Sequence, residues 1–234
     1  VAVRMTLLAL LLLAAGLRWF RFDAQSLWND EGNSARLAER SVRLILEGAA
    51  GDIHPPLYYL ALHYWRALAG QTEFALRTFS VAGGIGLVAL CYALGTRLFN
   101  PATGLTTAAL AAMNPFQVYY SQEVRSYIWV ALLAAAAVYI SWRLAEFPCE
   151  PPTQNRARPW AAAYVLVVTA GLYTHYLFPI ALIPTLVLAW YHWGSRREWK
   201  RLGQWILLNL VAGALYAPWA PIAARLVTAK APTR

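Results

Sequence analysis

The stretch DIHPPLYYLALHYWRALAG, residues 52–70, decides the fold because it determines how often the chain crosses a membrane. Its apolar part, residues 55–70, is shorter than the roughly 20 residues that a helix needs to span a bilayer. On a helix, Tyr59, His63 and Arg66 fall on one face and apolar side chains fall on the other. We therefore predict a helix that lies at the membrane surface, with a short tilted span as the alternative.

The rest of the chain has the composition of a multi-pass membrane protein. Hydrophobic residues make up 59% of it, more than a soluble domain of this length normally carries. Candidate crossings are the apolar runs at residues 5–20, 75–99, 103–119, 126–145, 160–175, 177–194 and 203–220. The first run ends in Arg18, Trp19 and Phe20 rather than in small residues, so we interpret it as a retained anchor and not as a cleaved signal peptide.

Basic residues in the loops predict which side each loop occupies. Cytoplasmic loops are rich in Lys and Arg, and two loops stand out by containing Arg156, Arg158, Arg196, Arg197, Lys200 and Arg201. Two crossings separate these loops, so both can be cytoplasmic, as can the N-terminus with Arg4. A full crossing at 55–70 would move both basic loops outside. The net charge of +9 is then explained by such loops and by lipid headgroups, and nucleic acid is not expected as a partner.

These arguments predict an all-α transmembrane bundle in a plasma or inner membrane. We expect about seven crossings and a long external first loop, residues 21–74, that carries two juxtamembrane helices. The transmembrane module covers residues 1–220, and residues 221–234 begin a further external segment of a chain that we expect to be a fragment. Most acidic residues are then external, which indicates chemistry at that surface: Asp23, Asp30, Glu31, Glu39, Glu47, Asp52, Glu73 and Glu123.

The candidate catalytic residues are Asp30 and Glu31, in the segment SLWNDEGNSA. A carboxylate near apolar lipid becomes more basic through desolvation, which suits a general base that takes a proton from a hydroxyl. The alternative is structural, because Asn and Asp before a helix commonly cap its free N–H groups. Both interpretations remain open at this point.

Further candidates for donor-phosphate or substrate binding occur at the same predicted level. Asp52 and His54 precede two prolines and form either a site wall or a rigid turn. Arg77 begins a crossing, where it either faces the site or extends to the headgroups. His175 lies in a tight external turn and is either a site residue or a hydrogen-bonded helix end.

The loop SQEVRSY supplies the last candidates, Gln122, Glu123, Arg125 and Tyr127. Arginine can bind phosphate through two parallel hydrogen bonds, so we favour Arg125 as the phosphate ligand. The alternative is a surface ion pair of Glu123 with Arg125, flanked by ordinary interfacial aromatics. The chain has no P-loop, no dinucleotide fingerprint, no HExxH and no CxxC, so a lipid phosphate is a better donor candidate than a nucleotide.

Four ordered segments carry a family resemblance: LWNDE at 27–31, DIHPPLYYLA at 52–61, ALRTFSVAGGIGLVALCYALGTRLF at 75–99 and NPFQVYYSQEVRSYIWVALL at 114–133. Together they resemble the polyprenyl-phosphate-sugar-dependent glycosyltransferases of the C-type membrane fold, close to the protein O-mannosyltransferase and aminoarabinose transferase superfamily. The resemblance covers most of residues 5–194.

The resemblance implies a conserved seven-helix module and an inverting transfer at its external face. By resemblance, Asp30 is the base with Glu31 beside it, Asp52 and His54 line the cleft, and Arg125 approaches the donor phosphate. The implied partners are a polyprenyl-phosphate sugar, an acceptor protein, lipid or glycan, and membrane lipids. No cofactor is implied, and dependence on a divalent metal is left open. His54 stands where the aminoarabinose branch typically has Lys, which places the chain nearer the mannosyltransferase-like branch.

Two other classes of function compete with this one. A transporter or flippase also carries charges at membrane depth, but near the midplane and with inverted repeats, and neither pattern is visible here. A noncatalytic scaffold is the third possibility. Intact Asp30, His54 and Arg125 argue against the scaffold.

Overall fold

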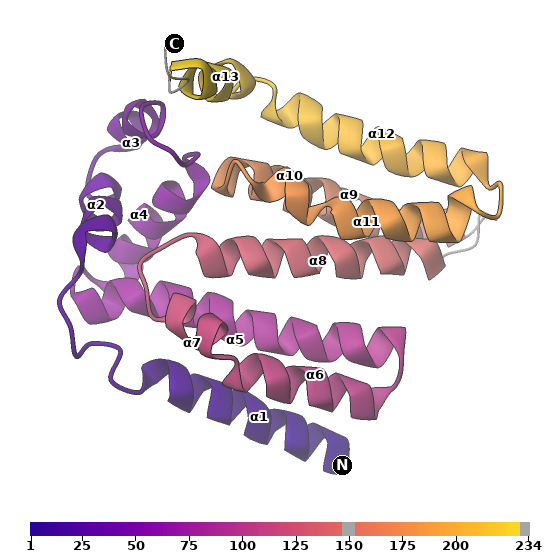
Figure 1. The fold of residues 1–234 in the computed structure, drawn as a ribbon, viewed down its shortest axis with the longest axis horizontal. Helices are drawn as coiled ribbons and strands as arrows, with labels where there is room; N and C mark the ends of the chain where they lie inside the picture. The colour runs from indigo at the N-terminus through magenta and orange to yellow at the C-terminus, as the bar shows by residue number, and fades with distance from the viewer. Residues whose placement is uncertain (147–152, 230–234) are drawn as a thin grey trace, which may run out of the picture. The chain divides into compact units, whose positions relative to one another are not determined.

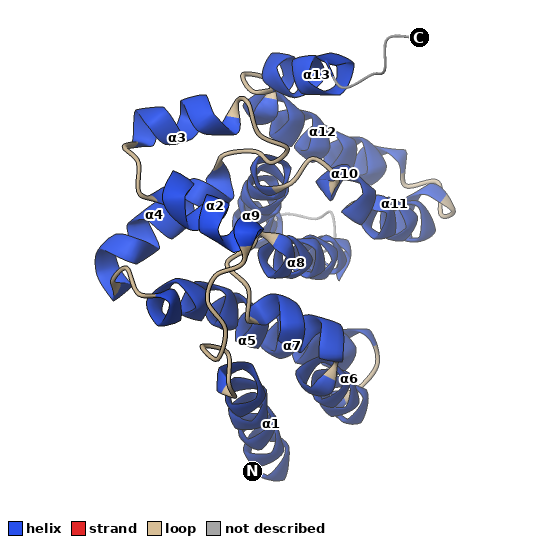
Figure 2. Cartoon of the chain, turned by 60° about the vertical axis from the view of Figure 1, so that its left-hand side comes forward, coloured by secondary structure: helices blue, strands red, loops and turns tan. Residues whose placement is uncertain are grey.

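A computed structural model describes residues 1–146 and 153–229, and within these ranges the chain forms helices and no strands (Figures 1 and 2). In chain order the helices are α1 (Ala2–Trp19), α2 (Asn29–Ala38), α3 (Val42–Ala49), α4 (Leu57–Ala69), α5 (Glu73–Leu98), α6 (Pro101–Met113), α7 (Pro115–Ser121), α8 (Tyr127–Glu146), α9 (Thr153–Thr174), α10 (Phe178–Ala181), α11 (Ile183–Ala189), the π-helix η1 (Trp190–Gly194), α12 (Trp199–Tyr216) and α13 (Ala220–Ala229). This confirms the predicted all-α class. The last part of the external segment predicted at residues 221–234, residues 230–234, lies outside the described residues.

The chain divides into two compact units. The first unit comprises Val1–Gly48 and Pro56–Ala135, and the second comprises Ala49–Pro55 and the described residues from Ala136 onward. Most of the external loop predicted at 21–74 belongs to the first unit, together with α1 and α5–α7.

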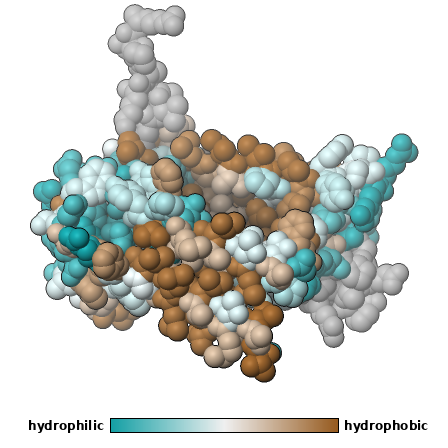
Figure 3. Space-filling model, turned by 60° about the horizontal axis from the view of Figure 1, so that its bottom comes forward, coloured by the Kyte–Doolittle hydropathy of each residue, from teal (hydrophilic) through white to brown (hydrophobic). Residues whose placement is uncertain are grey.

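Three helices in the described part of the chain are long and apolar enough to cross a membrane: α1, α5 and α8. At about 1.5 Å per residue, the 26 residues of α5 exceed the roughly 30 Å of a hydrocarbon core. Large apolar side chains are exposed on these helices, including Leu8 and Leu12 of α1, as expected where lipid replaces water. Figure 3 shows a broad area of such apolar residues on one face. The chain is therefore an integral membrane protein, while the number of crossings and the side of each loop stay predictions.

Helix α4, the core of the opening stretch, has only 13 residues, so it extends about 20 Å and is too short to span a bilayer alone. Tyr59 and Leu62 are buried, whereas Tyr64 and Leu68 are exposed at 60% and 85%. His63 Nδ1 lies 2.8 Å from the carbonyl oxygen of Ala38, at the C-terminal end of α2. An apolar outer face and a polar inner contact are what a surface-lying helix requires.

The loop 21–74 contains three short helices, where the sequence predicted two. The region before α4, where one helix was predicted, is divided into α2 and α3 at residues 39–41. Ser41 precedes α3, and its carbonyl accepts a hydrogen bond from Ile45 N at 2.9 Å. Serine is a favoured residue at a helix start, and this local preference separates α3 from α2. In Figures 1 and 2, α2 and α4 lie where α1 ends and α5 begins.

Close helix packing holds the first unit together. Helices α5 and α6 approach so closely that a Cβ added to Gly95 would lie 2.9 Å from the Cα of Gly104. Thr107 Oγ1 donates to the carbonyl of Cys91 across this contact at 2.9 Å. Small residues at helix interfaces are typical of membrane bundles, because there they permit dense van der Waals contact.

The predicted span 103–119 is not one continuous helix. Helix α6 ends at Met113, and Asn114 Oδ1 accepts from Gln117 N at 3.0 Å, which caps α7. Pro115 then occupies the first turn of α7, where its missing N–H costs nothing. The predicted span 177–194 is likewise divided into α10, α11 and η1, and prolines stand in the first turns of α10 and α11.

Arg18 compensates for the break between α6 and α7. Its side chain is fully buried and donates hydrogen bonds to the carbonyls of Ala111 and Ala112 at 3.2 and 3.1 Å. Its Nε also donates to Ser121 Oγ at 3.1 Å. A buried helix end in an apolar medium needs such partners, because each unpaired carbonyl is costly there.

In the second unit, α9 packs against α12. Tyr164 of α9 is fully buried, and its hydroxyl donates to Asn209 Oδ1 of α12 at 3.1 Å. Asn209 in turn donates to the carbonyl of Trp205, one turn earlier in α12. This polar contact joins two largely apolar helices.

Candidate active site

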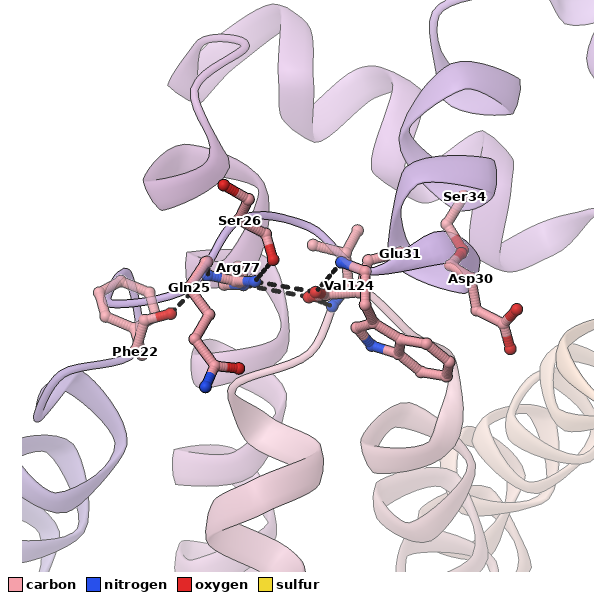
Figure 4. A network of polar contacts seen from close by, with 9 residues as sticks. Phe22, Gln25, Ser26, Asp30, Glu31, Ser34, Arg77 and Val124 are labelled. Carbon is pink, nitrogen blue, oxygen red and sulfur yellow. Dashed lines mark hydrogen bonds and ion pairs between the residues drawn. The ribbon is translucent and has the colours of Figure 1, made fainter.

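A buried ion pair connects two segments far apart in the sequence. Arg77 of α5 donates two hydrogen bonds to Glu31 of α2, from Nε to Oε1 at 3.0 Å and from Nη2 to Oε2 at 2.8 Å (Figure 4). Glu31 is 1% exposed and Arg77 is 4% exposed. Two parallel charge-assisted hydrogen bonds form the strongest geometry available to this pair of side chains.

Arg77 is fully occupied within the first unit. Its Nη1 donates to the carbonyls of Phe22 and Gln25 at 2.6 and 2.8 Å, and Nη2 lies 3.5 Å from the carbonyl of Ser26. With the two bonds to Glu31, these contacts account for all five N–H groups of a guanidinium. The α1–α2 loop is thereby fixed to the start of α5, and no donor of Arg77 is left for a phosphate.

The hydrogen-bond acceptor sites of the Glu31 carboxylate are also all used. Besides the two bonds from Arg77, its Oε1 accepts from Val124 N at 2.8 Å and its Oε2 accepts from Trp28 N at 3.3 Å. Four donors match the roughly four lone-pair sites of a carboxylate. Val124 adjoins Arg125 in the α7–α8 loop, so Glu31 connects that loop to the start of α2.

Asp30 lies next to Glu31, but its carboxylate has a different environment. Figure 4 shows it pointing away from the Glu31–Arg77 pair. Its Oδ2 lies 3.4 Å from Arg125 Nη2, and 40% of the Asp30 side chain is exposed, against 8% for Arg125. Residue 28, not Asp30, is the N-cap of α2, and the carboxylate that binds the cap N–H belongs to Glu31. The capping alternative for Asp30 is therefore wrong, and Asp30 is free to face solvent or substrate.

Arg125 is held in place beside Asp30. Its Nη2 donates to the hydroxyl of Tyr127 at 3.2 Å, and its Nη1 lies 3.5 Å from the backbone carbonyl of Asp30. The guanidinium carbon lies 5.4 Å from the centre of the Tyr127 ring. The structure thus brings Asp30, Arg125 and Tyr127 together, and their role as a site stays a prediction.

Glu123 and Gln122 precede Arg125 and serve different purposes. Glu123 is 6% exposed, and this burial raises the pKa of its carboxyl, as does the nearby charge of Glu31. Hydrogen bonds from Tyr119 and Trp28 and the charge of Arg125 act on this pKa in the opposite direction. Gln122 Nε2 lies within 3.3 Å of the carbonyls of residues 17, 18 and 20, at the end of α1. Glu123 and Arg125 are both buried, so they do not form the surface ion pair considered above.

A cavity of about 440 Å³ adjoins this network in the first unit. The residues that line it come from the α1–α2 loop, α2, α5, α7 and the α7–α8 loop: Arg21, Phe22, Ala24, Gln25, Ser26, Trp28, Glu31, Arg77, Tyr119, Gln122 and Glu123. The sequence did not single out Trp28 or Tyr119. Their signal in the sequence was their place in LWNDE and NPFQVYYSQEVRSYIWVALL, two of the segments that carry the family resemblance.

The remaining candidates belong to the second unit and are brought together there. His54 is 5% exposed, and its ring centre lies 5.0 Å from that of His175, with the ring planes at 72°. His175 Nδ1 accepts from Leu177 N at 3.1 Å, which agrees with a hydrogen-bonded helix end. Asp52 Oδ1 accepts from Ile53 N, next to it in the turn. That these residues line the site of Asp30 stays a prediction. Within the described ranges, no group of three or more His, Cys, Asp or Glu is placed to hold a metal ion.

Comparison with known proteins identifies a family. The family model described as dolichyl-phosphate-mannose-protein mannosyltransferase matches residues 53–222. This range includes His54, Arg77, Arg125 and His175, and it begins after Asp30. No curated protein and no solved structure matches the chain.

Proposed function

The chain belongs to the dolichyl-phosphate-mannose-protein mannosyltransferase family, and from that premise we propose that it transfers a sugar from a polyprenyl-phosphate donor to an acceptor hydroxyl at the external face of the membrane. The family and the long apolar helices together make it an integral membrane glycosyltransferase of the mannosyltransferase type. Mannose is the first sugar to test, since the family description names it, and an aminopentose is the second.

One observation carries the proposal. The partly exposed carboxylate of Asp30, in the first turn of α2, lies 3.4 Å from the buried guanidinium of Arg125. At this distance, the Asp30 carboxylate and the Arg125 guanidinium can act on the same displacement reaction in two different roles. The carboxylate accepts the proton of the acceptor, and the cation stabilises the charge that develops on the departing phosphate. Arg125 suits this second role because a guanidinium matches phosphate oxygens bidentately.

In the proposed reaction, the acceptor oxygen attacks the anomeric carbon of the donor sugar while Asp30 takes the hydroxyl proton. The bond between the anomeric carbon and the phosphate oxygen breaks, and its electron pair leaves with the polyprenyl phosphate. Attack opposite to the leaving group inverts the anomeric configuration. Donor binding would draw Arg125 toward the phosphate and release Asp30 from its contact at 3.4 Å, so the base is freed when the donor is present.

Glu31 and Arg77 take positioning roles in this proposal, in place of the direct roles that the sequence suggested for them. Glu31 is bonded to Val124 N and adjoins Asp30, so a single side chain fixes the base and the arginine relative to each other. Rigid support of this kind matters because a misplacement of about 1 Å can cost on the order of 100-fold in rate. We propose Asp52, His54 and His175 as a separate contact surface for the donor or the acceptor.

The test is sugar transfer in membranes from cells that express the gene encoding this chain. A panel of radiolabelled polyprenyl-phosphate sugars serves as donors, and wild type is compared with Asp30→Asn. The matched control is Asp23→Asn, because Asp23 is an exposed acid in the same loop. Transfer that is lost in Asp30→Asn and retained in Asp23→Asn supports the proposal. Transport of a lipid-linked sugar without any transfer would favour the flippase alternative.

A further inference from the structure

Positive charge gathers in the turn between η1 and α12, in the second unit (Figure 1). The segment SRREWK contributes Arg196, Arg197 and Lys200, and all three are exposed. Glu198, the acid among them, accepts from Arg201 Nη1 at 3.0 Å. Among the described residues, no carboxylate forms an ion pair with Arg196, Arg197 or Lys200. These three residues, here named the basic turn, are therefore open to an anion.

Backbone hydrogen bonds fix the shape of the basic turn. Ser195 N donates to the carbonyl of Trp190 at 2.9 Å, and Glu198 N donates to the carbonyl of Trp193 at 2.8 Å. Between these bonds, Arg197 has a φ of 59°, which residues with a Cβ adopt only where the surrounding structure imposes it. The exposed basic side chains thus start from one defined backbone conformation.

An apolar groove of about 620 Å³ extends to the basic turn. Its lining residues lie along α11, η1 and the residue that follows: Leu186, Val187, Trp190, Tyr191 and Ser195. Their spacing places them on one side of the helix. The four large side chains among them are 55–62% exposed, as expected where lipid covers a surface. Ser195 adjoins Arg196 in the chain, so the groove ends where the basic turn begins.

The groove and the basic turn together match a membrane lipid with a negatively charged headgroup. Its phosphate can accept hydrogen bonds from guanidinium and ammonium groups, while an acyl chain covers the apolar groove. A soluble anion would leave the groove unused, and a lipid without net charge would leave three cations uncompensated. The basic residues also predict a cytoplasmic position for this loop, and anionic lipids are concentrated in the cytoplasmic leaflet.

We propose that the basic turn and the apolar groove form a binding site for an anionic diacyl phospholipid of the bilayer. The basic turn binds the phosphate, and one acyl chain lies in the groove. A lipid held in this way contacts α11, η1 and the start of α12, and so stabilises the second unit. The site takes no part in sugar transfer, so it stands or falls independently of the proposed function.

A phosphatidylglycerol with a photoactivatable acyl chain tests the proposal on the full chain in detergent micelles. Cross-links located by mass spectrometry are expected within residues 183–200. Unlabelled phosphatidylglycerol should compete about tenfold better than phosphatidylcholine with the same acyl chains, because each Lys or Arg near the headgroup favours the anionic lipid. Glycerol phosphate, which has no acyl chain, should not compete. Equal competition by phosphatidylcholine would overturn the proposal, and stronger competition by a polyprenyl phosphate would assign the site to a donor lipid instead.

A double variant of the basic turn tests the role of its charge. Arg196→Gln with Arg197→Gln should lower cross-linking about tenfold, and it should unfold at the wild-type temperature when phosphatidylglycerol is absent. Arg36→Gln with Arg40→Gln is the matched control, because it removes the same charge from two exposed positions in the first unit. Wild-type cross-linking in the basic-turn variant, or an equal loss in the control, would contradict a specific headgroup site.

A filled groove tests the position of the acyl chain. Val187→Trp places a large side chain in the groove and should lower cross-linking while the basic turn is intact. Leu207→Trp is the control, because Leu207 of α12 is 57% exposed and does not line the groove. Cross-linking that is as strong in Val187→Trp as in Leu207→Trp would show that the lipid does not occupy the groove.

Discussion

Arg77 donates to both carboxylate oxygens of Glu31, at 3.0 and 2.8 Å, in a site where neither residue is more than 4% exposed. The pair joins α5 to α2 across 46 residues of sequence. The bond from Val124 N to Glu31 then extends the connection to the loop that carries Arg125. This buried pair thus serves as a frame for its less buried neighbours, Asp30 and Arg125.

Arg77→Met tests this frame. Removing one partner of a buried pair leaves the other charge uncompensated, which costs about 3–5 kcal/mol, and the carbonyls of Phe22 and Gln25 also lose their donor. We expect a clearly lower unfolding temperature in detergent and a loss of transfer. Arg36→Met is the control, because Arg36 is an exposed arginine of α2. Equal unfolding temperatures for Arg77→Met and wild type would contradict the role of the frame.

Arg125→Lys tests phosphate binding. Lysine keeps the positive charge but cannot form the two parallel bonds of a guanidinium, so we expect the KM for the lipid-phosphate donor to rise about tenfold or more. Arg125→Gln should lower transfer further, because the charge is also lost. Donor-concentration curves measure both effects. A donor KM unchanged in both variants would show that Arg125 does not contact the phosphate.

Glu123→Gln tests the buried carboxyl through the pH dependence of stability. The folded-state pKa of Glu123 lies above its ordinary value of 4.5, chiefly because of burial. The favourable contribution of the neutral form is therefore fully present below that value, and it is lost as the pH rises through the raised pKa. Glu123→Gln has no proton to lose. We expect the unfolding temperature of wild type to fall relative to that of Glu123→Gln as the pH increases from about 4 to 7.

A constant difference between these two proteins over this pH range would show that folding leaves the pKa of Glu123 unshifted. The hydrogen bonds from Tyr119 and Trp28 would then offset the effect of burial on its pKa.

Arg18→Met tests the compensation at the break between α6 and α7. The substitution removes the donors that satisfy the carbonyls of Ala111 and Ala112, and each buried unsatisfied group costs about 1–3 kcal/mol. We expect a reduced unfolding temperature and a reduced yield of folded protein. Arg4→Met near the exposed N-terminus should behave like wild type, which thermal unfolding in detergent can verify.

The sequence predicted the features that depend on composition and helical period. Apolar runs located α1, α5 and α8, and the length and facial pattern of residues 55–70 predicted a helix too short to cross, observed as α4. Features that depend on a single local residue were missed. Ser41 begins a new helix, and Asn114 with Pro115 divides an apolar run that looks continuous by hydropathy alone.

The candidate site was predicted in part for the same reason. The external loops indicated Asp30, Arg125 and Tyr127, which lie together. The sequence could not separate Asp30 from Glu31, because neighbouring residues on a helix point in different directions and only the fold determines which carboxylate meets Arg77. The role of Arg18, which satisfies the carbonyls at the end of α6, follows only from the structure. In sequence, a buried arginine of an apolar helix cannot be distinguished from one that extends to the headgroups.

The most direct test of the account is the rate of sugar transfer at saturating donor for Asp30→Asn and Asp30→Glu, each compared with wild type and corrected for the amount of folded protein. Removal of a general base commonly costs about 100- to 10,000-fold. The account predicts a loss of this size in Asp30→Asn, with partial activity in Asp30→Glu and an unchanged unfolding temperature. Transfer by Asp30→Asn at the wild-type rate would contradict the central claim that Asp30 is the base.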